Sequence, residues 1–184
     1  MISLPFRRQT QDPRIARLYG TIVAQARSPS FYAEYGVPDT VAGRLDMILL
    51  HLVLVLRSLG RGSEPLQAMG QEVFNQFCRD IDDNFREMGV GDLSVPKEMR
   101  RVGEAYYGRA AVYDAALAAG EDQLVDALAR NIFDGPADGA RRLAAYVGEC
   151  VAGLAEQDGF LNGELRFPEP SKIAVARHAS GARV

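Results

Sequence analysis

The sequence predicts a single all-α domain of six or seven helices. Apolar residues recur at helical spacing through most of the chain, as in the run from Leu66 to Met88. Glycine and proline separate these runs, and no segment shows the alternation of apolar and polar residues that is typical of a strand. Segment 40–59 is apolar nearly all round, which predicts a buried central helix packed against a long helix hairpin over 64–119.

Turn and cap residues place the elements in order. Asp12 followed by Pro13 predicts the start of a first helix that runs to about Arg27, where Ser28 and Pro29 end it. A short helical turn over 31–35 follows, and segment 38–40 caps the central helix. Two further helices are expected after the hairpin, over 121–133 and 138–157. The predicted organisation is a flexible N-terminal arm (1–11), a helical domain (12–167) and a disordered basic C-terminal tail (168–184).

The predicted hairpin is centred on a short polar turn. Gly89 stands where a helix C-terminal cap is expected, Ser94 is suited to be the N-cap of the next helix, and Pro96 falls in its first turn. An Asp82–Arg86 ion pair is expected within the first helix, because these residues are four apart. Antiparallel pairing would also place acidic residues before the turn opposite basic ones after it. The expected cross-turn pairs are Glu87 with Lys97, Asp83 with Arg100 and Asp82 with Arg101.

The composition is that of an ordinary soluble domain. The chain has 184 residues, of which 47% are hydrophobic and 24% charged, and its net charge is −3. That charge argues against DNA binding driven by bulk electrostatics. The longest apolar run, 47–56, is about half the length of a membrane span, and the N-terminus lacks the apolar core of a signal peptide. We therefore expect a cytoplasmic protein, with a peripheral contact at the inner face of the membrane left open for its two ends.

No catalytic constellation is visible in the sequence. Cys78 and Cys150 lack metal-ligand spacing and are expected to be buried, reduced thiols, and His51 is expected to be a hydrogen-bonded core or rim residue. Asp82 and Asp83 resemble half of a carboxylate metal site, but the second helix of the hairpin is the expected cover for these acidic groups. No cofactor or metal is expected. Two alternatives stay open: a small metal-dependent enzyme acting on an isoprenoid, and a structural helical subunit.

Two long motifs resemble a known family. The run DDNFREMGVGDLSVPKEMRRV (82–102), followed by AYYGR (105–109), is similar to the signature of the ubiquinol–cytochrome c chaperone family. The earlier run ARSPSFYAEYGVPDTVAGRLDMILLHLVLVLR (26–57) resembles the other long motif of that family. Together the motifs cover about a third of the chain.

The resemblance implies a non-catalytic assembly chaperone without a cofactor of its own. Its client would be newly made cytochrome b, which it would help to mature into respiratory complex III. The mitochondrial members of the family work with a small partner protein and associate with the ribosome near its tunnel exit. The resemblance therefore makes both of them candidate partners here.

We expect the client to bind in a groove between apolar elements. Its walls would be helix 40–59, the aromatic turn 31–35 and the paired tyrosines 106 and 107, with turn 89–97 as a polar contact at one end. The rival interpretation is that these residues are simply core. The candidate binding residues are Phe31, Tyr32, Tyr35, His51, Asp82, Asp83, Arg86, Glu87, Gly89, Val90, Gly91, Asp92, Leu93, Lys97, Tyr106, Tyr107 and Arg109.

Overall fold

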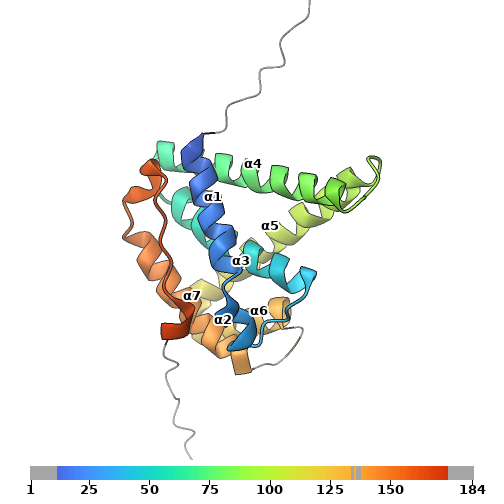
Figure 1. Ribbon diagram of the computed structural model, residues 1–184. Helices are drawn as coiled ribbons and strands as arrows, with labels where there is room; N and C mark the ends of the chain where they lie inside the picture. Colours follow the sequence, from blue (N-terminus) through green and yellow to red (C-terminus); the bar gives the residue numbers. More distant parts are fainter. Residues whose placement is uncertain (1–11, 134, 136–137, 174–184) are drawn as a thin grey trace, which may run out of the picture.

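The all-α fold predicted from the sequence is confirmed. The computed structural model describes residues 12–133, 135 and 138–173, and within them it contains helices but no strand (Figure 1). The elements in order are α1 (Pro13–Ala26), α2 (Pro29–Ala33), α3 (Val41–Gly60), α4 (Glu64–Glu87), α5 (Val95–Ala119), α6 (Glu121–Ile132) and α7 (Asp138–Ala155), followed by two short 3-10 helices, η1 (Gly159–Asn162) and η2 (Pro170–Lys172).

Helix α3 is the centre of the molecule. Every residue from Met47 to Val55 is buried, so this stretch has no face turned to solvent. Five helices share the task of covering it, since α1, α4, α5, α6 and α7 all contact α3. The arrangement follows from the sequence: a helix that is apolar all round is stable in water only when it is enclosed.

Local cap signals fix where the helices begin. The Asp12 carboxylate accepts a hydrogen bond from the Arg14 backbone N–H, and Pro13 occupies the first turn of α1. The Thr40 hydroxyl accepts from the Gly43 N–H at 3.0 Å and starts α3. Both caps lie where the sequence predicts them.

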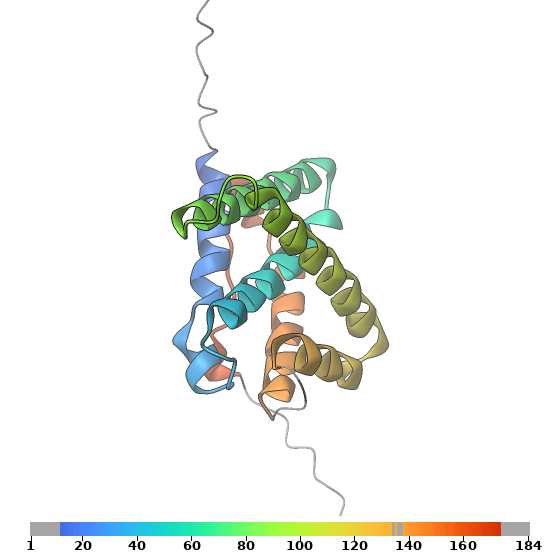
Figure 2. The same cartoon turned by 90° about the vertical axis from the view of Figure 1, so that its right-hand side faces the viewer.

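Helices α4 and α5 do not form the expected antiparallel pair. They are joined by the turn 88–94 and diverge from it, so that the far end of α5 reaches α6 instead of the start of α4 (Figures 1 and 2). The reason is α3, which packs against both helices and separates them away from the turn. We call the joined ends, residues 81–101, the arm; in Figure 1 it projects beyond the rest of the domain.

A buried hydrogen-bond chain crosses the core between three helices. Gln25 in α1 donates to the Tyr146 hydroxyl at 2.9 Å, and Tyr146 in α7 is 2.8 Å from Nε2 of His51 in α3. The other ring nitrogen, Nδ1, is 2.7 Å from the Met47 carbonyl, which can only accept. The proton of a neutral His51 ring therefore sits on Nδ1, and Tyr146 donates to Nε2. His51 is thus a hydrogen-bonded core residue, one of the two positions that the sequence left open for it.

The ordered domain extends further than the expected boundary at residue 167. Residues 168–173, predicted to begin the disordered tail, lie against the domain: Pro170 is buried, and η2 contacts α2. Pro168 and Pro170 were expected to exclude a regular element, but Pro170 begins the 3-10 helix η2, and the segment packs on the domain. The predicted N-terminal arm (1–11) and the remaining tail (174–184) lie outside the described residues.

The buried His51 predicts a specific pH dependence of stability. Burial lowers the pKa of His51 from 6.5 to about 4, so protonation favours the unfolded chain, in which the pKa is higher. As the pH is lowered from 6.5 to 4, the free energy of unfolding should decrease by up to about 1.4 kcal/mol per pH unit. The total loss from this group alone is about 3 kcal/mol. Urea unfolding of the native protein and of His51→Gln across this range isolates the effect. If the free energy of unfolding had the same pH dependence in both proteins, His51 would not be the source of the effect.

Candidate functional site

The arm ends in a turn whose geometry is set by Gly89. This residue has a φ of +80°, and its N–H donates to the Arg86 carbonyl, while the Val90 N–H reaches back to the Phe85 carbonyl at 3.0 Å. The two bonds form a Schellman motif, and the half-buried side chains of Phe85 and Val90 are in the positions that make its usual apolar contact. Gly89 therefore caps α4 as predicted. Ser94 begins α5 without a side-chain cap bond, unlike the prediction.

The arm and the outer face of α5 present large apolar side chains to solvent. Leu93 in the turn is 98% exposed and Met88 is 61% exposed. On the outer face of α5, Tyr107 is 65% exposed and Val112 is 40% exposed. We call these four side chains the arm surface. Such residues are costly to leave in water unless a partner covers them, which makes them the leading candidates for a binding role.

Tyr107 is the outer member of an aromatic cluster that reaches into the core. Its ring centroid lies 5.1 Å from that of the buried Tyr106, which in turn lies 4.8 Å from the half-buried Phe74 of α4. Burial raises the pKa of Tyr106 to about 12. The cluster supports Tyr107 from below, so the exposed ring is held on a packed base.

The charged residues of the arm pair locally. Arg86 bonds Asp82 at 2.7 Å, as expected for residues four apart, and also bonds Asp92 of the turn at 2.5 Å. Arg100 and Arg101 pair within α5, with Glu104 and Glu98. The cross-turn pairs predicted from the sequence (Glu87 with Lys97, Asp83 with Arg100, Asp82 with Arg101) are not formed; Asp82 pairs with Arg86 instead, and Arg100 and Arg101 pair with residues of α5.

Arg109 of α5 forms an ion pair with α3 instead of projecting from the surface toward a binding protein. Its Nη2 lies 2.5 Å from Oδ1 of Asp46 in α3, and both side chains are less than one-fifth exposed. Burial raises the pKa of Asp46, and the Arg109 charge opposes that rise. A second pair, Arg57 with Asp114 at 2.5 Å, joins the same two helices further along. Arg109 is therefore a positioning residue that holds α5 on α3.

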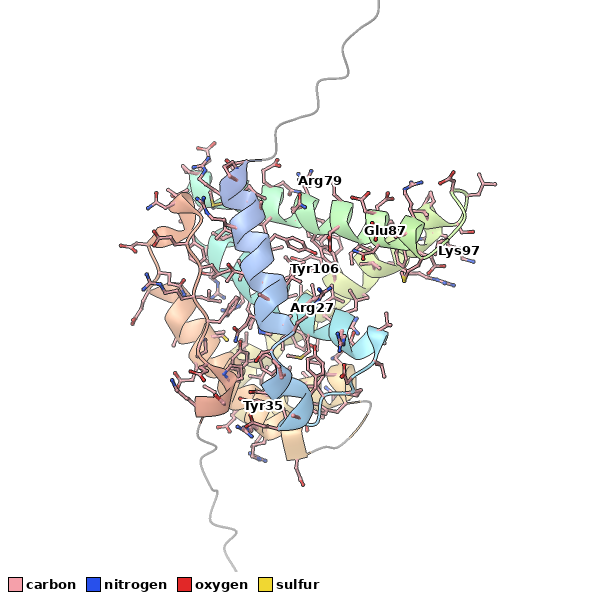
Figure 3. The ribbon with its side chains drawn as sticks, viewed as in Figure 1. Arg27, Tyr35, Arg79, Glu87, Lys97 and Tyr106 are labelled. Atoms are coloured by element: carbon pink, nitrogen blue, oxygen red, sulfur yellow. The ribbon has the colours of Figure 1, made fainter. Side chains whose placement is uncertain are left out.

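The structure divides the predicted site residues into three groups by burial. Phe31, Tyr35, His51 and Tyr106 are buried, so the walls of the expected groove are core and the rival interpretation is correct for these four. Figure 3 places Tyr35 at the end of the molecule away from Glu87 and Lys97, which lie on the arm. The half-buried members are Tyr32, Asp82, Val90 and Arg109, and the exposed members are Asp83, Arg86, Glu87, Gly89, Gly91, Asp92, Leu93, Lys97 and Tyr107.

Two members of the arm surface were missed by the sequence reasoning. Met88 was assigned to the apolar stripe of α4, but it is the last residue of that stripe and follows the helix end, where no neighbour covers it. Val112 was not considered. Val112 directly precedes the inward-facing Tyr113 and therefore lies on the outer face of α5. The helical periodicity of this segment could have predicted its exposure.

No metal site is formed by the residues that the structure describes. Across 12–133, 135 and 138–173 no three His, Cys, Asp or Glu side chains gather in a way that could hold an ion. Asp80 instead accepts a hydrogen bond from Tyr19 of α1 at 2.8 Å. Within the same residues, no helix is both long and apolar enough to cross a membrane.

Fold and surface together define an all-helical protein with a projecting helical arm, and four of its exposed large apolar side chains lie on that arm and on the outer face of α5. Comparison with known proteins places it more narrowly. The model of the ubiquinol–cytochrome c chaperone family matches residues 33–167. The crystal structure of the Cbp3 homolog from Brucella abortus superposes with a TM-score of 0.81 at 37% identity, covering 89% of this chain and 93% of that one.

A curated relative agrees with this placement. The ubiquinol-cytochrome-c reductase complex assembly factor 1 of Xenopus laevis is 24% identical over 155 residues, which are 81% of this chain and 78% of the frog protein. The chain belongs to the ubiquinol–cytochrome c chaperone family. The family resemblance noted in the sequence is thereby confirmed.

The Arg109–Asp46 pair predicts a stability effect. Arg109→Met leaves the Asp46 carboxylate largely buried without its partner, so the free energy of unfolding should fall by about 2 kcal/mol, somewhat less than for a fully buried pair. Arg100→Met is the matched control, because the Arg100–Glu104 pair is exposed and should contribute less than about 1 kcal/mol. Urea unfolding measures both. Equal losses in the two variants would contradict a linking role for Arg109.

Proposed function

We propose that this chain is a non-catalytic chaperone that binds newly made cytochrome b and assists its assembly into ubiquinol–cytochrome c reductase. Membership of the chaperone family supports the assembly role, and the Xenopus laevis relative is itself named as an assembly factor for that complex. Cytochrome b as the client follows from the resemblance of the two sequence motifs. The binding would take place at the cytoplasmic face of the membrane, where the client is inserted.

The observation that carries the proposal is the arm surface. A client protein that is still unassembled exposes apolar segments, and these bury best against apolar and aromatic side chains that are already free of the core. Leu93 and Tyr107 have this character. We place the client on this surface rather than in the expected groove, because Phe31, Tyr35 and Tyr106 are buried in the core. A small partner protein or the ribosome would meet the same chain elsewhere.

Site-specific photo-crosslinking tests the client and the surface together. A photoreactive residue at position 93 or 107 of the tagged full chain should capture cytochrome b from cells that are assembling the reductase. Position 161 serves as the control, because Leu161 is also an exposed apolar residue but lies in η1, at the other end of α4 from the turn (Figure 1). The crosslinked partner is identified by mass spectrometry.

A pair of charge substitutions gives the same test in quantitative form. Leu93→Asp and Tyr107→Asp should each weaken capture of cytochrome b by roughly 30-fold, the effect of losing an anchor worth ~2 kcal/mol, while Leu161→Asp leaves it unchanged. All three side chains are exposed, so each variant should keep the native circular dichroism spectrum. Folded variants that capture cytochrome b as well as the native chain would overturn the proposed surface. Capture of no cytochrome b by the native chain would overturn the proposed client.

A further inference from the structure

Residues 164–173 lie on the domain as an irregular segment that ends in η2, and side chains of the domain bind every second carbonyl from Arg166 to Pro170. The segment, orange to red in Figure 1, passes from η1 to α2. Gln157 donates to the Arg166 carbonyl at 2.8 Å, Gln25 to the Pro168 carbonyl at 3.1 Å, and Tyr35 to the Pro170 carbonyl at 2.7 Å. The three donors come from three parts of the domain: the end of α7, α1, and the residues after α2.

Apolar side chains of the segment fill sites between these donors. Leu165 and Pro170 are buried, and the Phe167 ring packs edge-on against His51 with 5.2 Å between ring centroids. The surface beneath is aromatic: Phe31, Tyr35, His51 and Tyr146 contact one another as rings at centroid distances of 4.9 to 6.5 Å. The domain thus binds the segment through its main-chain carbonyls and through a few apolar side chains.

Residues 170–172 of the segment form the 3-10 helix η2, and the residues on either side of it have backbone angles near those of polyproline II. Glu169 has φ −75° and ψ 119°, and Ile173 has φ −71° and ψ 116°. Two of the three bound carbonyls belong to prolines, which have no N–H to leave unpaired. Aromatic surfaces that donate to the carbonyls of proline-containing segments are a recurrent way of recognising peptides in this conformation.

The segment is attached to the domain by side chains. Among the described residues, the backbone-to-backbone hydrogen bonds of 164–173 run only within the segment or to η1. The segment begins directly after Gly163, whose φ of +77° is easily adopted by glycine. Release of 165–173 would therefore break no helix of the domain.

From this geometry we propose that the domain carries a peptide-binding groove for proline-containing segments, which its own residues 165–173 occupy. The occupant from another chain would be a segment with an aromatic residue followed by Pro-x-Pro and a short turn, the sequence pattern and shape that the groove already holds. Because the resident segment is tethered, its effective concentration is on the order of millimolar, and a free peptide would compete poorly until the segment is released. The inference does not depend on which protein the arm binds.

Peptide binding to an opened full-length variant tests the proposal. Phe167→Ala combined with Pro170→Ala truncates two of the three apolar side chains that fill the groove and leaves the donors intact. A fluorescein-labelled peptide of sequence LRFPEPSKI, residues 165–173, should bind this variant about tenfold or more tightly than it binds the native chain, as measured by fluorescence anisotropy. The same peptide with both alanine changes is the control ligand and should bind more weakly to the opened variant.

A change in the groove itself identifies the binding site. Tyr35→Phe, added to the opened variant, removes only the hydroxyl that donates to the Pro170 carbonyl, and should weaken peptide binding by about two- to tenfold. An opened variant that keeps its helical spectrum and cooperative unfolding but binds the peptide no better than the native chain would overturn the proposal. The segment would then be an ordinary part of the core.

Hydrogen exchange of the native chain keeps the proposal testable if the opened variant does not fold. The Arg166 N–H donates to the Gln157 side chain at 2.9 Å, so its exchange reports release of the segment. The Arg166 amide should exchange through a local opening of the segment, so low concentrations of urea should leave its exchange rate unchanged. The amide of Leu52 in α3 should exchange only through global unfolding, so urea should increase its exchange rate. Exchange of both amides with the same urea dependence would show that the segment does not separate from the domain, and the proposal would fall.

Discussion

The enclosure of α3 is the constraint on which the rest of the structure depends. A helix with buried residues at every position from Met47 to Val55 must be covered on all sides. In a chain of this length, most of the other helices are needed to cover it. Five helices contact it. Two ion pairs join α3 to α5, one through Asp46 and one through Arg57. Apolar packing alone does not set the position of α5 along α3, and these pairs help to fix it.

The same constraint explains why the arm projects. Where α4 and α5 lie on α3 their inner faces are used, and Phe77 and Tyr113 are buried there. Beyond the end of α3 the two helices have only each other to pack against, and they meet near a tight turn. Two helices cannot bury apolar side chains on every face, so Met88 and Leu93 are left in solvent. The exposure of these residues is a consequence of the fold, and it leaves them free for a partner.

Features that depend on neighbouring residues were predictable from the sequence, and those that depend on distant ones were not. The caps at Asp12 and Thr40 and the positive φ of Gly89 are local, and each lies where it was predicted. The cross-turn ion pairs failed because α3 sets the angle between α4 and α5. For the aromatic turn, periodicity could not tell core from binding surface, since Phe31 and Tyr35 are covered by Tyr146 and by the segment after Gly163, both more than 100 residues away. Pro168 and Pro170 suggested a tail without regular structure, but Pro170 begins the 3-10 helix η2, because contacts with the distant α2 hold these residues on the domain.

Aromatic residues accordingly have two different functions in this fold. On the outer face of α5, Tyr107 is exposed over a packed base of Tyr106 and Phe74, which suits contact with an apolar surface. Around His51, the aromatic rings are covered by residues 165–173, and three donors select the backbone of an extended segment. The first surface has no specificity for main-chain conformation and needs no opening step, whereas the second requires release of its own segment before anything else can bind. A chaperone built in this way would make its first contact with a client through the arm, and any binding of an extended segment would have to follow.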